Sequence, residues 1–396
     1  MKKSVFYFPV WGDDYIKLFS DFALKCLYNN LNKIDDSLLQ ASKIEIWTFK
    51  KDIPKLKALK NIELLKKKIS INIESIDLIY NDLKKSNLNK YQTLSILQKI
   101  FINSHSYKFE YFWFIYPDFI FSNQMISNFF NVKKKYDAYF IPVPQLIENE
   151  VKFQLIDNNF KTNTNNITEL LFKFLHPIVK ICDVENSKTN TPSMFFASDK
   201  NTYAFKYFHM HPLVIKSDIE NIEMNNEFYA SLDEGLVKSL NEKNIFITKD
   251  NFFGICISLL KENEYLLPNE RFNFNKTIEW CKNHINKTHL AISNHTYIVR
   301  KKFSQKNKKL ENKINKRLNP IKKELLKYKD KKIDEDYQVH IDLVDLNDEI
   351  YSIIRDNHFK NYFQVNSTTL KKRINDKNKT KDPIFKWLKN IYLKNL

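Results

Sequence analysis

The sequence predicts an α/β protein with an open, mostly parallel sheet flanked by helices, followed by a basic helical C-terminal region. Two observations predict this class. Between residues 4 and 144, short apolar runs typical of buried strands alternate with longer stretches whose apolar residues recur at helical spacing. The run YFWFIYPDFIF at 111–121 is apolar almost throughout, as expected for a strand that is buried on both faces of a parallel sheet.

The expected elements follow one another along the first part of the chain. Runs of β-branched and aromatic residues predict strands at 4–10, 43–49, 69–76, 111–121 and 136–144. Helical spacing predicts helices at 13–31, 90–107 and 123–135. The first of these helices begins at Asp13 and Asp14, either of which is a suitable N-cap.

Beyond residue 150 the pattern is less regular. The segments expected there are a helix interrupted at Pro177, a helix from Asp233, a strand at 244–250, a basic helical segment from 301, and helices at 346–357 and 382–396. We therefore divide the chain into an α/β domain over 1–295 and a basic helical region over 296–396.

The composition disfavours several classes of enzyme. The chain has 396 residues and three glycines, Gly12, Gly235 and Gly254, which stand far apart. Isolated glycines cannot build the G-x-G-x-x-G turn of dinucleotide-binding proteins or a phosphate-binding P-loop. Nicotinamide enzymes, most Rossmann methyltransferases and P-loop kinases are therefore disfavoured. The four cysteines have no metal-ligand spacing, which indicates reduced thiols in a cytosolic protein.

Positive charge is concentrated in one segment. Residues 301–332 carry fourteen Lys and Arg against three acids, which supplies +11 of the net charge of +18. The segment lacks the interleaved aromatic residues of a nucleic-acid-binding surface, so nucleic acid is a disfavoured partner. It could instead hold the protein against anionic lipid. The N-terminal apolar run contains Pro9 and Trp11 and does not fit a secretory signal, and no apolar stretch reaches the roughly 18 residues of a membrane span.

Residues that follow the first two predicted strands are candidate ligand contacts. Ligands of open parallel sheets bind beyond the carboxyl ends of the strands. Val10, Trp11 and Gly12 follow the first strand and could approach a nucleotide, or could form a plain strand–helix connection. Asp52 follows the second strand and could accept hydrogen bonds from a ribose or a uracil-type edge. The alternative for Asp52 is an exposed N-cap.

Three later stretches carry groups suited to catalysis or metal binding. Within the apolar run, a strand end is expected at Pro117-Asp118. A carboxylate at the end of a buried strand needs a partner such as a divalent cation, unless Asp118 caps a turn. His209 and His211 are two residues apart on an extended segment and could face one cavity as metal or phosphate partners, or be structural. Asp233 and Glu234 begin a helix, where a carboxylate could act as a base or simply start the helix.

Five stretches together resemble a known family. They are FPVWGDDYIKLF (8–19), IEIWTFKKDIPKL (44–56), FWFIYPDFIFSN (112–123), YFHMHPLVIK (207–216) and SLDEGLV (231–237). In this order they resemble a bacterial family of glycosyltransferase-like proteins with the GT-A fold, over about residues 4 to 250. The pairing of P-V-W-G with H-x-H-P is the most specific element.

The resemblance implies a glycosyltransferase over 1–295 that moves a sugar from a nucleotide-sugar donor to a cell-envelope or capsular glycan or a lipid-linked acceptor. It assigns nucleotide binding to Val10, Trp11, Gly12, Thr48, Asp52 and Asp118. It assigns Mn²⁺ or Mg²⁺ binding to Asp118 with His209 or His211, and the role of base to Asp233 or Glu234. The implied location is the cytoplasm, with peripheral attachment to the inner membrane through 301–332.

The sequence also departs from the family pattern. Tyr116-Pro117-Asp118 has one carboxylate where the D-x-D metal motif has two, and Asn123 replaces a second aspartate. Metal dependence is therefore open. The alternative function is a non-catalytic nucleotide- or glycan-binding protein on a transferase-like scaffold.

Overall fold

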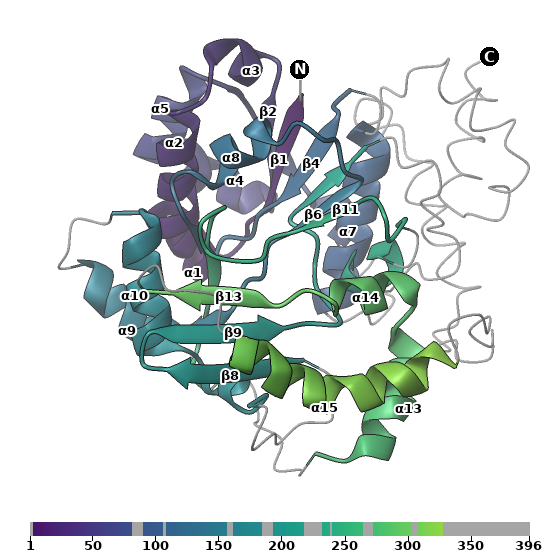
Figure 1. Ribbon diagram of the computed structural model, residues 1–396. Helices are drawn as coiled ribbons and strands as arrows, with labels where there is room; N and C mark the ends of the chain where they lie inside the picture. Colours follow the sequence, from purple (N-terminus) through teal and green to yellow (C-terminus); the bar gives the residue numbers. More distant parts are fainter. Residues whose placement is uncertain are drawn as a thin grey trace, which may run out of the picture.

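The computed structural model describes residues 3–80, 90–105, 108–156, 161–183, 193–217, 232–237, 240–263, 272–301 and 308–327. A seven-stranded main sheet lies at its centre (Figure 1), in the order β11 (Ile245–Ile247), β6 (Ala138–Phe140), β10 (Val214–Lys216), β4 (Tyr111–Phe114), β1 (Ser4–Pro9), β2 (Lys43–Thr48) and β3 (Ser70–Ser75). β10 runs antiparallel to both of its neighbours, and the other strand pairs of this sheet are parallel.

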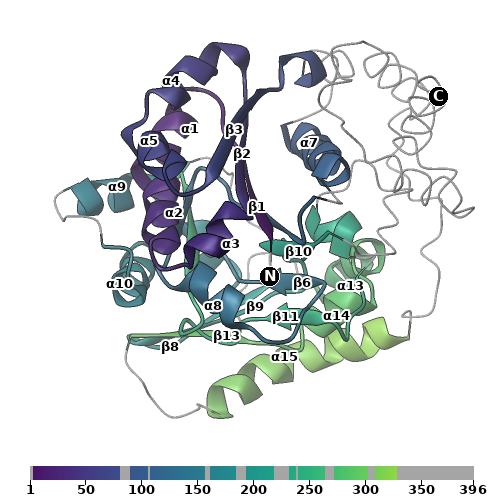
Figure 2. The same ribbon diagram turned by 90° about the horizontal axis from the view of Figure 1, so that it is seen from above.

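Helices cover both faces of the main sheet (Figure 2). One face packs against α1 (Asp13–Leu18), a π-helical turn (Phe19–Ala23), α2 (Leu24–Leu31) and α5 (Lys60–Lys66), and the other against α7 (Lys90–His105). Side chains of β1 alternate between the two core clusters, with Phe6 and Phe8 in one and Val5 and Tyr7 in the other. The predicted class, an α/β protein with an open, mostly parallel sheet flanked by helices, is confirmed.

The N-cap predicted for the first helix is wrong. Gly12 is the N-cap, with a φ of 80° that favours glycine, and Asp13 and Asp14 lie in the first turn. Their carboxylates bind lysines instead, Asp13 with Lys55 at 2.5 Å and Asp14 with Lys261 at 3.1 Å.

The apolar run 111–121 is not one continuous strand, but the strand end expected at Pro117-Asp118 is confirmed, because the chain turns there. The backbone N–H of Phe119 donates to the carbonyl of Tyr116 at 3.1 Å, and Pro117 has no N–H to pair in a sheet. β5 (Phe119–Phe121) therefore leaves the main sheet and joins β12 (Cys256–Leu260) and β7 (Gln145–Ile147). The break places Asp118 in a turn.

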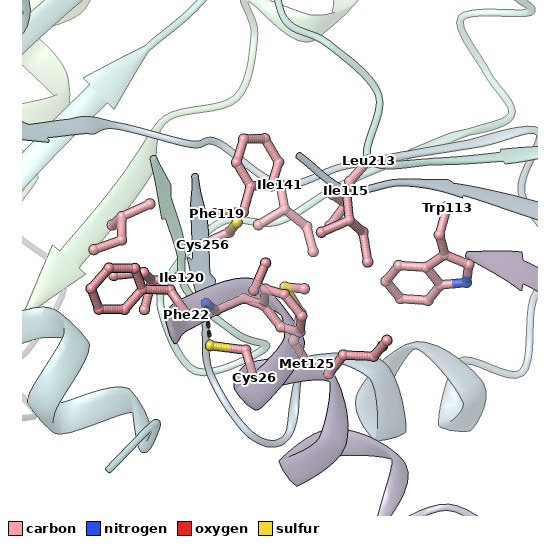
Figure 3. Close-up of a cluster of buried hydrophobic side chains, with 14 of the residues drawn as sticks. Phe22, Cys26, Trp113, Ile115, Phe119, Ile120, Met125, Ile141, Leu213 and Cys256 are labelled. Atoms are coloured by element: carbon pink, nitrogen blue, oxygen red, sulfur yellow. Dashed lines mark hydrogen bonds between the residues drawn. The ribbon is translucent and has the colours of Figure 1, made fainter. Parts of the chain in front are cut away.

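The second sheet packs against the main sheet in one buried cluster. Figure 3 draws this cluster, with Phe22, Cys26, Trp113, Phe119, Ile120 and Cys256 among its members. The backbone N–H of Phe121 contacts the Cys26 Sγ at 3.5 Å, which joins β5 to α2. Apolar packing on this face thus holds the turn that carries Asp118.

A third sheet lies below the main one in Figure 1 and consists of β8 (Met194–Asp199), β9 (Thr202–Lys206) and β13 (Tyr297–Arg300). α15 (Lys308–Leu326) and α13 (Phe274–His284) pack beside it through the buried Ile321, Leu325 and Ile278. The expected boundary at 295/296 falls just before β13, which pairs with β9. The domain division itself stays a prediction, and the helices expected at 346–357 and 382–396 lie outside the described residues.

The helix expected around 168–181 ends at Phe174 and restarts at Pro177, so the interruption predicted there is confirmed. The remaining elements are α3 (Asp36–Gln40), η2 (Lys50–Asp52), α4 (Ile53–Lys57), α8 (Met125–Asn131), α9 (Glu148–Ile156), α10 (Thr164–Phe174), α11 (Pro177–Lys180), η3 (Leu232–Leu236) and α14 (Lys287–Ile292). Within the described ranges, no helix combines the length and apolarity needed to cross a membrane.

Candidate functional site

The strand order places a ligand-binding position between β1 and β4. The chain runs from β1 outward to β2 and β3, then returns to β4 on the other side of β1. Ligands of open α/β sheets bind at such a switch point, outside the carboxyl ends of the strands. Residues 10–12 follow β1 here, and residues 115–118 follow β4. We call this end of the main sheet the carboxyl edge.

The antiparallel direction of β10 brings the H-x-H-P stretch to the same edge. Leu213 accepts a backbone hydrogen bond from Phe114 at 2.9 Å, and Val214 pairs with Trp113. Because β10 begins where β4 ends, His211 lies beside the residues that follow β4. A parallel β10 would have placed it at the opposite edge.

A chain of hydrogen bonds joins His211 to Tyr116 and Gln98. The His211 Nδ1 lies 2.8 Å from the carbonyl oxygen of Pro212, which can only accept, so Nδ1 carries the hydrogen. The Nε2 then accepts from the Tyr116 hydroxyl at 2.9 Å, and the Gln98 amide donates to that hydroxyl at 2.5 Å. Burial lowers the pKa of His211, which favours this neutral form.

Two carboxylates lie within electrostatic reach of the Tyr116 hydroxyl. Burial raises the pKa of Tyr116, the Gln98 hydrogen bond offsets part of this, and the negative charges of Asp233 and Asp118 raise it further. Asp118 is held in its turn by a backbone hydrogen bond from Leu259 to its carbonyl at 3.0 Å. Of the predicted groups, His211 therefore bonds to Tyr116 directly, and the charges of Asp118 and Asp233 act on the same hydroxyl.

His209 pairs with Asp233, the candidate base. The His209 Nδ1 lies 2.9 Å from the Asp233 Oδ2, and the two side chains are 21% and 27% exposed. Asp233 belongs to η3, so the structure confirms that the helical segment reaches this residue. The side chain of Glu234 lies outside the described residues. Asp233 thus combines a histidine partner with partial access to solvent.

Asp52 joins the turn after β1 to the loop after β2. It is fully buried, and its Oδ2 accepts the backbone N–H of Gly12 at 3.0 Å. Its Oδ1 lies 3.3 Å from the Lys55 Nζ. Both carboxylate oxygens are therefore occupied within the protein, and this carboxylate positions the P-V-W-G turn. A direct contact of Asp52 with a nucleotide stays a prediction.

The aromatic residues after β1 and β2 are more accessible than their neighbours. Val10 and Thr48 are fully buried, whereas Trp11 and Phe49 are partly exposed. The Trp11 and Phe49 rings lie 6.0 Å apart in a T-shaped arrangement, a favourable geometry for an aromatic pair. The two partly exposed rings thus pack against each other beside the carboxyl edge.

The histidines predicted as metal ligands have other partners. Both ring nitrogens of His211 lie at hydrogen-bond distance from protein oxygens, and the His209 Nδ1 faces Asp233. Over the described part of the chain, no three His, Cys, Asp or Glu side chains form a group that could hold a metal ion. His211 could bind a metal only by giving up Tyr116 or Pro212.

The sequence did not single out Gln98, Tyr116, Phe49 or His289 as site residues. Tyr116 directly precedes Pro117-Asp118, and Phe49 follows Thr48, so each is a neighbour of a predicted site residue. His289 stands three residues after Asn286, the spacing of a helix N-cap and its partner. Gln98 carries no local signal, because a glutamine within a helix is ordinary.

No protein-family model and no curated protein matches the chain. Fourteen chains among the solved structures match. One of them, residues 1–349 of TarS from S. aureus, has 11% sequence identity and a TM-score of 0.29. The match covers 100% of this chain and 92% of that one. A match at this level supports no conclusion about activity, and the fold description rests on the sheet topology given above.

Proposed function

We propose that the protein is a glycosyltransferase that moves a sugar from a nucleotide-sugar donor to a cell-envelope or capsular glycan or a lipid-linked acceptor. One observation carries the proposal. The Tyr116–His211 bond, the nearby Asp118 and the His209–Asp233 pair gather at the switch point between β1 and β4. Neutral and charged groups of this kind can hold a polar donor and remove a proton beside it.

The donor would bind along the carboxyl edge. Trp11 and Phe49 present an aromatic surface on which a nucleobase can stack. The Gly12 turn beside them, fixed by Asp52, would set the distance between the chain and the nucleotide. The sugar would then lie toward β4, where Tyr116 and Asp118 are.

Asp233 is the proposed base. Its carboxylate would take the proton of an acceptor hydroxyl while the hydroxyl oxygen forms a bond to the anomeric carbon of the donor sugar. The bond between that carbon and the phosphate oxygen breaks, and the nucleotide leaves with the electron pair. His209 would hold the carboxylate in place through the 2.9 Å contact between the two side chains.

The basic segment 301–332 would hold the enzyme against the cytoplasmic face of the membrane. In α15, Lys316 and Lys323 are exposed, and each lysine near an anionic surface contributes about 1 kcal/mol. The proposal predicts co-sedimentation with vesicles that contain anionic lipid and loss of that binding at high salt.

The test is a screen of UDP-, GDP- and CMP-sugars, each with Mn²⁺, with Mg²⁺ and with chelator. We expect thermal stabilisation by one nucleotide class, and turnover of its sugar. A Trp11→Ala variant should lose the stabilisation, while Phe153→Ala, which removes a 75% exposed aromatic ring on α9, should keep it. Absence of turnover from every donor, under all metal conditions, would refute the proposal.

A non-catalytic nucleotide- or glycan-binding protein is the second candidate. It is favoured by the single carboxylate in Tyr116-Pro117-Asp118 and by the protein partners that occupy His211. It predicts the same nucleotide stabilisation without turnover, and Asp233→Asn should then leave nucleotide binding unchanged.

A further inference from the structure

The start of α14 contacts both ends of the segment that carries Asp233. The His289 Nε2 lies 2.9 Å from the backbone carbonyl oxygen of Asp233. The hydroxyl of the preceding residue, Thr288, donates to the carbonyl of Leu240 at 2.8 Å. Because two successive residues of one helix bind the two ends, α14 fixes this segment relative to the rest of the fold.

His289 also contacts the histidine that pairs with Asp233. Its ring stacks on the His209 ring with centroids 5.4 Å apart and an angle of 8° between the planes. The ring of His289 is completely buried, whereas that of His209 is partly exposed. One buried side chain therefore touches both members of the His209–Asp233 pair, the aspartate through its backbone and the histidine through its ring.

Both ring nitrogens of His289 have hydrogen-bond partners. The Nε2 faces a carbonyl oxygen, so it carries a hydrogen and donates. The Nδ1 then accepts the backbone N–H of Asn286 at 3.3 Å. The side-chain oxygen of Asn286 accepts the backbone N–H groups of Thr288 and His289, so Asn286 caps α14. The ring cannot rotate without breaking contacts at both ends.

We propose that His289 is a positioning residue, which fixes the direction of the Asp233 carboxylate and the plane of the His209 ring at the carboxyl edge. The start of α14 requires only the contact between the His289 ring and Asn286. The bond to the Asp233 carbonyl and the stacking on His209 are separate contacts, and both are made with the His209–Asp233 pair. The proposal rests on the proposed function, because it takes Asp233 to be the catalytic base.

The chain offers a matched control in His176. This residue is also completely buried, and its Nδ1 accepts the backbone N–H of Ile178 at 3.1 Å, which caps α11. Its Nε2 lies 3.3 Å from the carbonyl oxygen of Lys261. Each histidine therefore accepts a backbone N–H at the start of a short helix with one nitrogen and faces a distant carbonyl with the other. Of the contacts just given, those of His289 reach the His209–Asp233 pair and those of His176 do not.

The kinetic experiment compares His289→Asn with His176→Asn. Asparagine can reach the position of Nδ1 and keep the cap, but it cannot reach the distant carbonyl. We expect His289→Asn to lower kcat by about 10- to 100-fold with little change in the KM of the donor, because misplacement of a catalytic group costs rate. His176→Asn should lose similar stability and keep its kcat. His289→Gln, whose amide can reach the Asp233 carbonyl, should recover part of the loss.

A second readout does not depend on activity. Hydrogen exchange followed by mass spectrometry measures opening of the segment 232–237 in each variant. We expect exchange there to be about tenfold faster in His289→Asn than in wild type, and unchanged in His176→Asn. Equal exchange in both variants would refute the positioning role, whether or not the protein turns over a donor. Faster exchange with no turnover in wild type would refute the proposed function and keep the structural inference.

Discussion

Among the described residues, two histidine–carboxylate pairs lie beside the main sheet, and their surroundings differ. His209 and Asp233 meet at the carboxyl edge with 2.9 Å between Nδ1 and Oδ2. His105 and Glu45 meet between the end of α7 and the amino-terminal half of β2, with 3.2 Å between Nε2 and Oε1. The chemical groups are almost the same in the two pairs, so any difference in role must come from the fold.

The carboxylate of Glu45 is enclosed by partners. It is 1% exposed and also contacts the Lys43 Nζ at 2.6 Å and the Asn72 amide at 3.0 Å. Asp233 is 27% exposed and lies at the switch point of the sheet. An enclosed carboxylate with several donors stabilises the fold, whereas a partly exposed one beside a ligand position can exchange a proton. The comparison predicts that changes in the His209–Asp233 pair lower activity, whereas changes in the His105–Glu45 pair lower stability.

The largest expected effect comes from Asp233→Asn. The amide keeps the size of the side chain but cannot take a proton, so turnover should fall by about 100-fold or more. The free energy of unfolding should change little, because the side chain is partly exposed. Steady-state kinetics and urea unfolding on the same preparation check both parts. Wild-type turnover in this variant would remove Asp233 from the mechanism.

Glu45→Gln should show the reverse pattern. Loss of the charge weakens the contacts with Lys43 and His105 and should lower the free energy of unfolding by about 1–3 kcal/mol. Turnover at a temperature where the variant is folded should stay within about twofold of wild type. A large loss of kcat in the folded variant would show that the two pairs are not separate in function.

Tyr116→Phe tests the hydroxyl that connects Gln98 to His211. Its removal leaves the acceptor Nε2 of His211 without this donor, and we expect about a tenfold loss of kcat with about 1 kcal/mol of stability. Tyr7→Phe is the control, because the buried Tyr7 hydroxyl has no hydrogen-bond partner among the described residues. That variant should be as stable as wild type or more so. Equal effects in the two variants would count against a role for the Tyr116 hydroxyl.

The smallest effect is a pH dependence that belongs to the enclosed pair. Burial opposes ionisation of Glu45, but the hydrogen bonds and charges of His105 and Lys43 outweigh it, so its pKa lies below the ordinary value of 4.5. The unfolded chain therefore binds the proton more readily than the folded one. The stabilisation is present above pH 4.5 and is lost as the pH falls through the folded pKa.

The measurement compares wild type with Glu45→Gln by urea unfolding at about pH 7 and about pH 4. The stability difference between the two proteins should shrink at the lower pH. A difference that stays constant would mean that the charge of Glu45 does not stabilise the folded protein.

Much of the fold could be predicted because its signals are local. Before residue 144, the five apolar runs correspond in order to β1, β2, β3, the pair β4 and β5, and β6. The three helical patterns correspond to the helical segment 13–31, to α7 and to α8. The errors occurred where two local rules compete. The apolar run 111–121 was interpreted as one strand, although Pro117 ends the ladder and the chain turns at Tyr116–Phe119. The N-cap was assigned to an aspartate, although a glycine with positive φ precedes the helix.

By itself, the sequence determined the α/β class and the stretches that carry Asp118, the H-x-H-P motif and Asp233, because hydrophobic periodicity and residue type are properties of single segments. Only the tertiary structure decided which of these side chains meet. The antiparallel direction of β10 brings His211 to Tyr116, and α14 brings His289 to Asp233. Asp52 and Glu45 became enclosed through partners that are distant in sequence or on a neighbouring strand. Such contacts depend on strand order and direction, and no local pattern encodes these.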